Sequence, residues 1–197
     1  ESALAGHDSI ADVAVIGEPS AIAGPEFEFL HLLSRGVACF KVRVWGTQMH
    51  SSLSDRLPSV NASIKMAQVL TRMDRDLKLT FTPHPLCQAP TGNLGVTVAG
   101  GVNYGVYPGV AEFKVDVRTL PGMTRQQVEH DLEALLAKLR REDPELKVEL
   151  IFEALPLGWM EPTEVRQDHP LVGILLDTCE TVLGRRPRLS AFPGGTD

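Results

Sequence analysis

The sequence predicts an α/β fold in which a small antiparallel sheet with two helices is inserted between two segments of a second α/β unit. Two observations lead to this prediction. Apolar and polar residues alternate in four segments, which is typical of strands with one buried face, and apolar residues recur at helical spacing in two others. These segments follow one another as strand, helix, strand, strand, helix, strand, which is the βαββαβ order of a ferredoxin-like domain.

Composition restricts the classes of function. The chain has 197 residues, 43% of them apolar and 22% charged, with a formal net charge of -6. The acidic balance argues against a nucleic-acid-binding surface, because the basic run at residues 185–188 is short. No apolar run is long enough to span a bilayer and the first residues lack a signal pattern, so we expect no membrane partner and a cytoplasmic location. Cys39, Cys87 and Cys179 are scattered, which predicts reduced thiols.

The first element that we expect is a strand at residues 12–16. Its continuous apolar run is typical of a strand buried on both faces in a parallel sheet. Glu18 follows at its carboxyl end, where open α/β sheets collect their functional residues. On position alone, a functional carboxylate and an ordinary turn carboxylate before Pro19 are equally good interpretations.

A half-buried strand is predicted at residues 37–45, where Phe40, Val42 and Val44 alternate with Lys41 and other outward positions. This strand type differs from that of residues 12–16. We therefore place a domain boundary near residues 34–36.

His50 lies in the loop after this strand, and a lone loop histidine is most often solvated. The next helix is predicted to open at Pro58 and Ser59. Apolar residues at helical spacing predict its buried face. The residues of that face are Val60, Ile64, Met66, Ala67, Val69, Leu70 and Met73.

Residues 92–122 predict two strands joined by a glycine-rich loop at residues 100–109, which is suited to bring backbone close to a ligand. The second strand ends with Arg118 on its polar face, where a guanidinium can bind a carboxylate through two hydrogen bonds. The residues expected on the buried faces are Leu94, Val96, Val98, Ala111, Phe113, Val115 and Val117.

The second helix begins at a capping box, in which the Thr124 hydroxyl is placed to accept from the Gln127 amide. A last half-buried strand follows at residues 148–152. The buried face of the helix is predicted to contain Val128, Leu132, Leu135, Leu136 and Leu139.

Beyond residue 156 a further helix is predicted, capped by Asp168, with Pro170 in its first turn and Gly184 at its end. Its inward residues are expected to be Leu171, Ile174, Leu175, Thr178 and Val182. A short strand at residues 188–192 leads to the loop at residues 193–197. Natural domains rarely finish on such a turn, so we expect a fragment, divided into residues 1–34, an inserted domain at residues 35–155, and residues 156–197.

Five short motifs occur in one order along the chain. They are Gly-Glu-Pro-Ser at residues 17–20, Gly-x-x-x-His-Ser at 46–51 followed by Asn-Ala at 61–62, Asn-x-Gly-x-x-Val-x-Gly-Gly at 93–101, Asp-x-Arg-x-x-Pro-Gly at 116–122, and Gly-Gly-Thr-Asp at 194–197. Together they resemble the zinc-dependent amidohydrolase and peptidase family that includes acetylornithine deacetylase, succinyl-diaminopimelate desuccinylase, aminoacylase and glutamate-releasing carboxypeptidase. Five motifs in order form a specific signal, and the resemblance covers essentially the whole chain.

The resemblance implies a hydrolase of an N-acyl amino acid or small peptide, active as a homodimer through the inserted domain. It implies that Glu18 binds one of two zinc ions, with cobalt or manganese as alternatives, and that His50 reaches into the partner subunit's active site to polarise the scissile carbonyl. The residues that it implies for substrate binding are Arg118, Asn103, Gly194, Gly195 and Thr196.

The sequence also departs from the family pattern. The His-x-Asp ligands, the Glu-Glu pair and the last ligand histidine of the family are absent from these residues, and Gly105 stands where an asparagine is expected. One carboxylate cannot hold two zinc ions, so we expect this chain by itself to be inactive and to bind metal poorly. An alternative is a non-enzymatic ferredoxin-like module that binds an amino acid or joins subunits. That alternative explains residues 35–155 but leaves the motifs at residues 17–20 and 194–197 as accidents.

Overall fold

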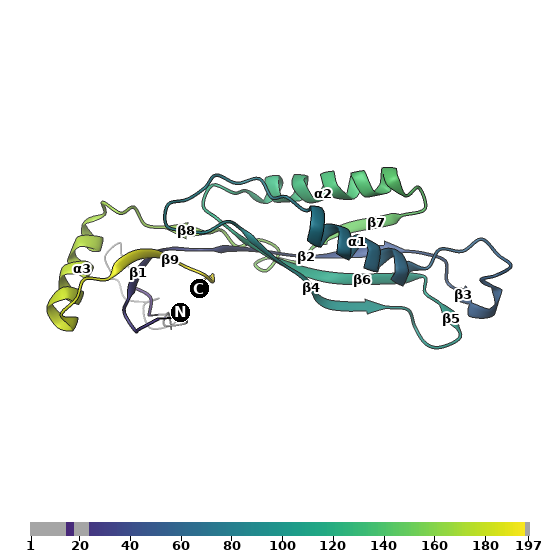
Figure 1. The fold of residues 1–197 in the computed structure, drawn as a ribbon, viewed down its shortest axis with the longest axis horizontal. Helices are drawn as coiled ribbons and strands as arrows, with labels where there is room; N and C mark the ends of the chain where they lie inside the picture. The colour runs from purple at the N-terminus through teal and green to yellow at the C-terminus, as the bar shows by residue number, and fades with distance from the viewer. Residues whose placement is uncertain (1–14, 18–23, 196–197) are drawn as a thin grey trace.

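The computed structural model describes residues 15–17 and 24–195, which form an elongated molecule with different sheets along its length (Figure 1). The central part is an antiparallel sheet with the strand order β4-β6-β2-β7. Its strands are β2 (Gly36–Trp45), β4 (Thr91–Gly100), β6 (Val110–Thr119) and β7 (Lys147–Phe152).

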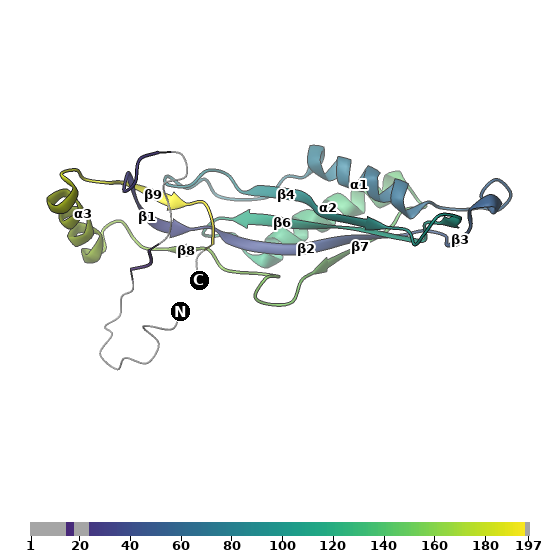
Figure 2. The same ribbon diagram turned by 90° about the horizontal axis from the view of Figure 1, so that it is seen from below.

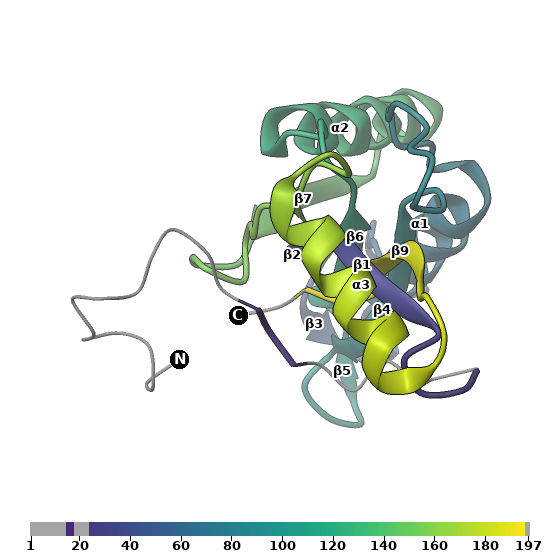
Figure 3. The ribbon, with the colours of Figure 1, turned by 90° about the vertical axis from the view of Figure 1, so that its left-hand side faces the viewer.

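Two helices, α1 (Ala62–Asp76) and α2 (Arg125–Glu142), cover one face of this sheet and leave the other face open, as Figures 1 and 3 show. The chain order β2-α1-β4-β6-α2-β7 and the strand order confirm the predicted ferredoxin-like inserted domain. Phe40 of β2 and Phe113 of β6 are completely buried beneath the helices. The alternation predicted for residues 37–45 and 111–117 is therefore correct.

Helix α2 also follows its prediction. The Thr124 hydroxyl accepts a hydrogen bond from the Gln127 N–H at 3.2 Å, and all five residues predicted for its buried face are buried. A capping side chain satisfies one of the amide groups that the first turn of a helix leaves free.

The start and the buried face of α1 differ from the prediction. The helix begins after Asn61, whose side chain accepts from the Ile64 N–H at 3.1 Å, and not at Pro58. Its buried residues are Ala62, Met66, Val69 and Met73, whereas Ile64 is 58% exposed. Ala67 is exposed too. Met66, Val69 and Met73 were predicted on the buried face and are buried, so the buried face is narrower than predicted.

Strand β4 is a second correction. The prediction placed Leu94, Val96 and Val98 on a buried face, but Val96 and Val98 are 48% and 55% exposed. The pairing of β4 with β6 shifts register between Leu94 and Val98, and Gly95 has a φ of 71°. Val98 pairs with the buried Phe113 and so keeps the face of Leu94, but β4 is an edge strand with no neighbour on its outer side among the described residues, which leaves both valines exposed.

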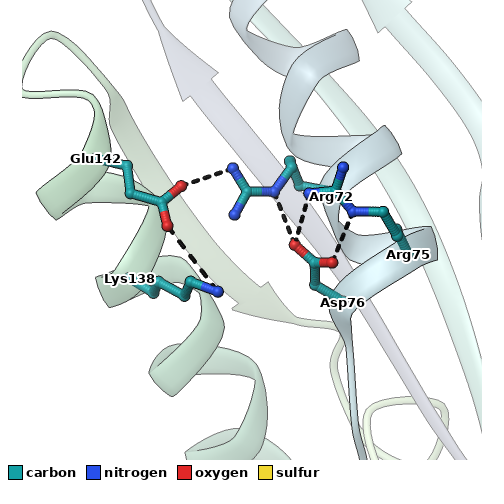
Figure 4. A network of polar contacts seen from close by, with 5 residues as sticks. All are labelled: Arg72, Arg75, Asp76, Lys138 and Glu142. Atoms are coloured by element: carbon teal, nitrogen blue, oxygen red, sulfur yellow. Dashed lines mark hydrogen bonds and ion pairs between the residues drawn. The ribbon is translucent and has the colours of Figure 1, made fainter.

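Ion pairs join α1 to α2 across a groove of about 480 Å³. Figure 4 shows Arg72 between two carboxylates: it donates to Glu142 of α2 at 2.6 Å and to Asp76 at 2.8 Å. Hydrogen bonds from Arg75 and then Arg72 lower the pKa of Asp76, and the Arg72 hydrogen bond lowers the pKa of Glu142. Both carboxylates are therefore held in the charged form in the folded protein.

We expect Arg72→Met to lower the melting temperature at pH 7 and to have a smaller effect near pH 2. A carboxylate whose pKa is lowered by folding stabilises the fold above about pH 4, and that contribution disappears as the pH falls through the folded-state pKa. Thermal unfolding at several pH values measures the difference. Lys138→Met, which removes a 4.0 Å contact with the same Glu142 carboxylate, should lower the melting temperature by a smaller amount. A difference between Arg72→Met and wild type that is the same at all pH values would contradict this account.

At one end of the molecule lies a three-stranded sheet with the order β8-β1-β9, accompanied by α3 (Figures 1 and 2). Strands β1 and β9 are parallel, and β8 pairs with β1 in the antiparallel direction. The bounds of these elements are β1 (Phe29–Ser34), β8 (Thr163–Glu164), α3 (Pro170–Leu183) and β9 (Arg188–Phe192). Strand β1 was not predicted, although its apolar run is visible in the sequence.

Three predictions for these flanking segments need correction. Val15 and Ile16, the described residues of the strand predicted at 12–16, lie outside any strand and are exposed, because no described strand pairs with them. The cap of α3 is His169, since Asp168 is bound to Arg166 instead. Ile174, Thr178 and Val182 were expected to face inward but are exposed, Ile174 to 61% and Val182 to 74%; the buried residue of α3 is Val172.

The inserted domain is connected to the rest of the chain by two backbone segments that lie side by side. Residues 34–36 lead from β1 into β2, and residues 153–162 lead from β7 to β8. Val37 and Met160 exchange two backbone hydrogen bonds, of 3.0 and 2.8 Å. No helix in the described ranges is both long and apolar enough to cross a membrane. The domain boundaries at residues 34/35 and 155/156 remain a prediction.

Candidate functional site

The predicted site residues that the structure describes form two clusters at opposite ends of the inserted domain. The base cluster consists of Arg118, Gly194 and Gly195, and lies where β2 meets β1. The tip cluster consists of His50 and Asn103, and lies at the far end of the long axis, near β3 and β5 (Figures 1 and 2). Glu18 and Thr196 lie outside the described residues.

Arg118 lies on the open face of the sheet, near the carboxyl end of β6. It pairs in register with Val37 of β2 and Thr91 of β4. Its Nε lies 3.2 Å from Asp116 Oδ1, and Asn93 Nδ2 donates to Asp116 Oδ2 at 3.4 Å. The Arg118 side chain is 36% exposed. Because Asp116 contacts Nε, the terminal amino groups of the guanidinium are left to face a carboxylate ligand.

The Gly194–Gly195 turn lies beside this arginine. The Arg35 N–H donates to the Gly194 carbonyl at 2.9 Å. A Cβ atom added at Gly195 would lie 3.3 Å from the Arg35 carbonyl and 3.6 Å from Val37 Cγ2, so the turn packs closely on the first residues of the inserted domain. Residues far apart in the sequence therefore come together at the base.

The tip cluster is built on a two-stranded sheet. His50 of β3 (Met49–His50) pairs with Val106 of β5 (Val106–Tyr107), and the Ser51 N–H donates to the Gly105 carbonyl at 2.8 Å. Gly105 has a φ of 78°, a conformation that favours glycine. Asn103 is bound within its own loop, since its side-chain oxygen accepts from the Tyr104 N–H at 2.8 Å.

The two clusters cannot act on one small molecule within a single chain. Strand β6 has ten residues and runs from the tip end to Arg118, so it spans about 30 Å. His50 lies beyond its first residue. His50 is exposed and Arg118 is half-buried, so neither side chain is packed in the core.

The described residues do not fit a dinuclear zinc centre. Among residues 15–17 and 24–195, no group of three or more His, Cys, Asp or Glu side chains is placed to hold a metal ion. A zinc site needs about four ligands, and Asp116 is already bound to Arg118. The three cysteines are free thiols, and burial, followed by the charge of Asp116, raises the pKa of Cys39.

The structure adds site residues that the sequence analysis did not identify. Asp116 was part of a motif, and its spacing of two from Arg118 within a strand was a usable signal because such residues share a face. No comparable signal in the sequence pointed to Arg35. Its buried guanidinium donates to the Gln88 carbonyl at 3.2 Å and to Thr91 Oγ1 at 3.4 Å. Ser52, which contacts His50, was missed as well.

Comparison with known proteins gives one family. Residues 32–144 match the model of the peptidase dimerisation domain of the M20 peptidases. Acetylornithine deacetylase of Proteus mirabilis is 31% identical over 180 residues, covering 89% of this chain and 42% of that protein. Acetylornithine deacetylase of Vibrio atlanticus is 30% identical over 175 residues, covering 86% and 43%. The chain thus spans less than half the length of these relatives.

Solved structures share the fold at lower sequence identity. A tripeptidase from Staphylococcus aureus superposes with a TM-score of 0.60 at 16% identity, covering 88% of this chain and 42% of that one. The aminopeptidase PepT from Bacillus cereus gives a TM-score of 0.59 at 14% identity, covering 86% and 41%. These similarities support the same arrangement of the inserted domain and its flanking segments.

Proposed function

This chain belongs to the M20 peptidase family and carries its peptidase dimerisation domain, and from that premise we propose that it is part of a dinuclear zinc hydrolase that cleaves the amide bond of an N-acyl amino acid or small peptide. The observation that carries the proposal is the similarity to acetylornithine deacetylases over nearly the whole chain. By itself, the chain supplies dimerisation and binding of the substrate carboxylate and is inactive.

The base cluster binds the substrate carboxylate in this proposal. Arg118 supplies the guanidinium, and the backbone of Gly194 and Gly195 lies beside it. We include Thr196, which is outside the described residues, as a further contact in this proposal. Support comes from the position of the Gly-Gly turn, which contacts Arg35 and Val37 next to Arg118. Asp116, which accepts a hydrogen bond from Asn93, holds the guanidinium at one edge, which reduces the entropy lost when a carboxylate binds.

Zinc, or cobalt or manganese in its place, supplies an activated water in a hydrolase of this kind. Glu18 is the ligand that we propose from this chain, and the remaining ligands and the general base belong to parts of the parent protein that this chain does not span. No further step is assigned to the metal, because the described residues do not form its site.

We propose a homodimer that joins through the β4 edge and α1. The exposed apolar residues Ile64, Val96 and Val98 lie on these two elements, which are neighbours, since a Cβ at Gly95 would lie 3.5 Å from Leu70 of α1. A two-fold axis at this edge makes the two β4 strands antiparallel. It therefore places the tip of each inserted domain toward the base of the other.

In that dimer His50 acts in the partner's active site, where it donates a hydrogen bond to the scissile carbonyl oxygen. The separation of about 30 Å between tip and base along a ten-residue strand supports this arrangement. Asn103 belongs to the same tip and reaches the same site. We also propose the domain division at residues 34/35 and 155/156, and a cytoplasmic location, which the free thiols favour.

The role of Arg118 is tested with Arg118→Ala in the full-length protein. We expect KM for a substrate with a free carboxylate to rise by about 10- to 100-fold, because a charge-assisted bidentate contact is lost. Steady-state kinetics with the substrate and its decarboxylated analogue measure this. Arg43→Ala is the matched control, since Arg43 lies on the same sheet face but is paired with Glu112 at 2.9 Å. Equal losses against both compounds would rule out the proposed role.

A further inference from the structure

The ring of His50 is held by two donors from one residue. Its Nδ1 lies 2.8 Å from Ser52 Oγ and 3.3 Å from the Ser52 backbone nitrogen. A backbone N–H can only donate, so Nδ1 must accept and carries no proton in this geometry. The Ser52 hydroxyl, which rotates freely, then donates to Nδ1 too, and the proton of the neutral ring is on Nε2.

We propose that Ser52 is a positioning residue that fixes both the orientation and the tautomer of His50, so that the tip presents Nε2–H as a hydrogen-bond donor. This inference rests on the proposed role of His50 at the scissile carbonyl. A donor aimed at an oxygen that gains negative charge is effective only when its direction is set before the reaction. The two contacts at Nδ1 set that direction, because they fix the ring and leave Nε2–H as its donor.

Two other histidines in the chain show which part of the arrangement is specific. His84 and His169 also accept at Nδ1 from the backbone N–H two residues later, at 3.2 and 3.3 Å. In both cases that later residue is a leucine, so no hydroxyl is present. The backbone contact is thus a common turn feature, and the 2.8 Å hydroxyl contact distinguishes His50.

A purely structural role of the contact is a weaker explanation. His50 is the N-cap of the 3₁₀ helix η1 (Ser51–Leu53), which has three residues and no buried side chain. So short and exposed an element gains little from a cap, and histidine is not among the preferred capping residues. The contact is therefore better explained by its effect on the orientation and tautomer of the ring than by its effect on the stability of the helix.

The tautomer is tested by ¹⁵N NMR of the histidine rings in the 197-residue chain. We expect Nδ1 of His50 to resonate as an unprotonated, hydrogen-bonded nitrogen and Nε2 as a protonated one. In Ser52→Ala the Nδ1 resonance should move toward that of an unbonded nitrogen, whereas Ser52→Thr should retain the wild-type value. His169 is the control within the same spectrum. A protonated Nδ1 in the wild type, or an unchanged Nδ1 resonance in Ser52→Ala, would overturn the proposal.

The positioning role is tested by kinetics of the full-length protein. Ser52→Ala should lower kcat about 5-fold with KM unchanged, Ser52→Thr should restore it, and Ser52→Ala should cause no further loss when His50 is already alanine. Ser54→Ala is the matched control, because Ser54 Oγ donates to the Ser51 carbonyl at 2.8 Å in the same turn and does not contact His50.

The outcomes separate this inference from the proposed function. A large loss in His50→Ala with normal kcat in Ser52→Ala would refute positioning by Ser52 and leave the function intact. Normal kcat in His50→Ala would refute the proposed role of His50 and with it the kinetic part of the inference, while the NMR result would still decide whether Ser52 sets the tautomer.

Discussion

Mixing the His50→Ala and Arg118→Ala variants of the full-length protein is expected to produce activity that neither variant has alone. Each variant by itself is impaired at both sites of its dimer. His50→Ala should lower kcat about 100-fold through loss of one oxyanion donor, with metal content unchanged. Arg118→Ala should be nearly inactive when the substrate concentration is below the wild-type KM.

Subunit exchange restores activity only if His50 acts across the dimer. A mixed dimer then has one site with both residues intact and one site that lacks both. Random exchange makes about half of the dimers mixed, so the activity should recover to about one quarter of the wild-type value. If each chain used its own His50, both sites of the mixed dimer would remain defective.

The control uses the same exchange with the double variant His50→Ala/Arg118→Ala. Mixed with either single variant, it offers no site with both residues, so no activity should appear. Recovery in the control would show an exchange artefact. A mixture of the two single variants that stays at the sum of their separate activities, although exchange is confirmed by mass spectrometry, would refute the two-chain site.

The second large effect is expected for Gly36→Ala, at the first residue of β2. A Cβ atom there would collide with Thr119 Oγ1, with the Met160 carbonyl oxygen at 2.5 Å and with Pro162 Cδ at 2.7 Å. The carbonyl and the proline ring cannot rotate away, so the backbone segments must separate. We expect a loss of about 3 kcal/mol in the free energy of unfolding, measured by chemical denaturation.

Gly92→Ala is the matched control for this change. Gly92 lies in β4 of the same sheet, and the nearest atom to an added Cβ is Leu94 Cδ2 at 3.9 Å. The substitution should therefore be neutral or stabilise by about 0.5 kcal/mol, since alanine restricts the unfolded chain more than glycine does. Similar changes in the free energy of unfolding for both substitutions would mean that crowding at Gly36 is not the cause of the destabilisation.

Local patterns predicted the elements whose signals are complete within a short segment. Helix α2 was placed correctly because the cap at Thr124 and five leucine or valine positions specify one start and one face. In α1, by contrast, the predicted face was too wide, because it included Ile64 as well as a second row through Met66. Packing against the sheet selects the second, and that choice depends on residues far along the chain.

The prediction for β4 was partly wrong for a related reason. Alternation assigns Val96 and Val98 to the same face as Leu94, and the pairing with Phe113 agrees for Val98, but the register shift after Leu94 and the edge position of β4 leave both valines exposed. A single glycine in a strand hints at such a shift and does not establish it. The roles of the site residues stay a prediction, and the division of the described ones into a base and a tip depends on the length of β6, which no motif encodes.

The two connecting backbone segments that pair at Val37 and Met160 determine how the chain can be shortened. Where a domain leaves and returns through hydrogen-bonded neighbours, cutting it out leaves two ends that nearly touch. Joining them needs only a short loop, and the outer sheet of β8, β1 and β9 keeps its own pairing. The inserted domain is thus a removable module, and a shortened version of this chain would test whether the outer sheet folds without it.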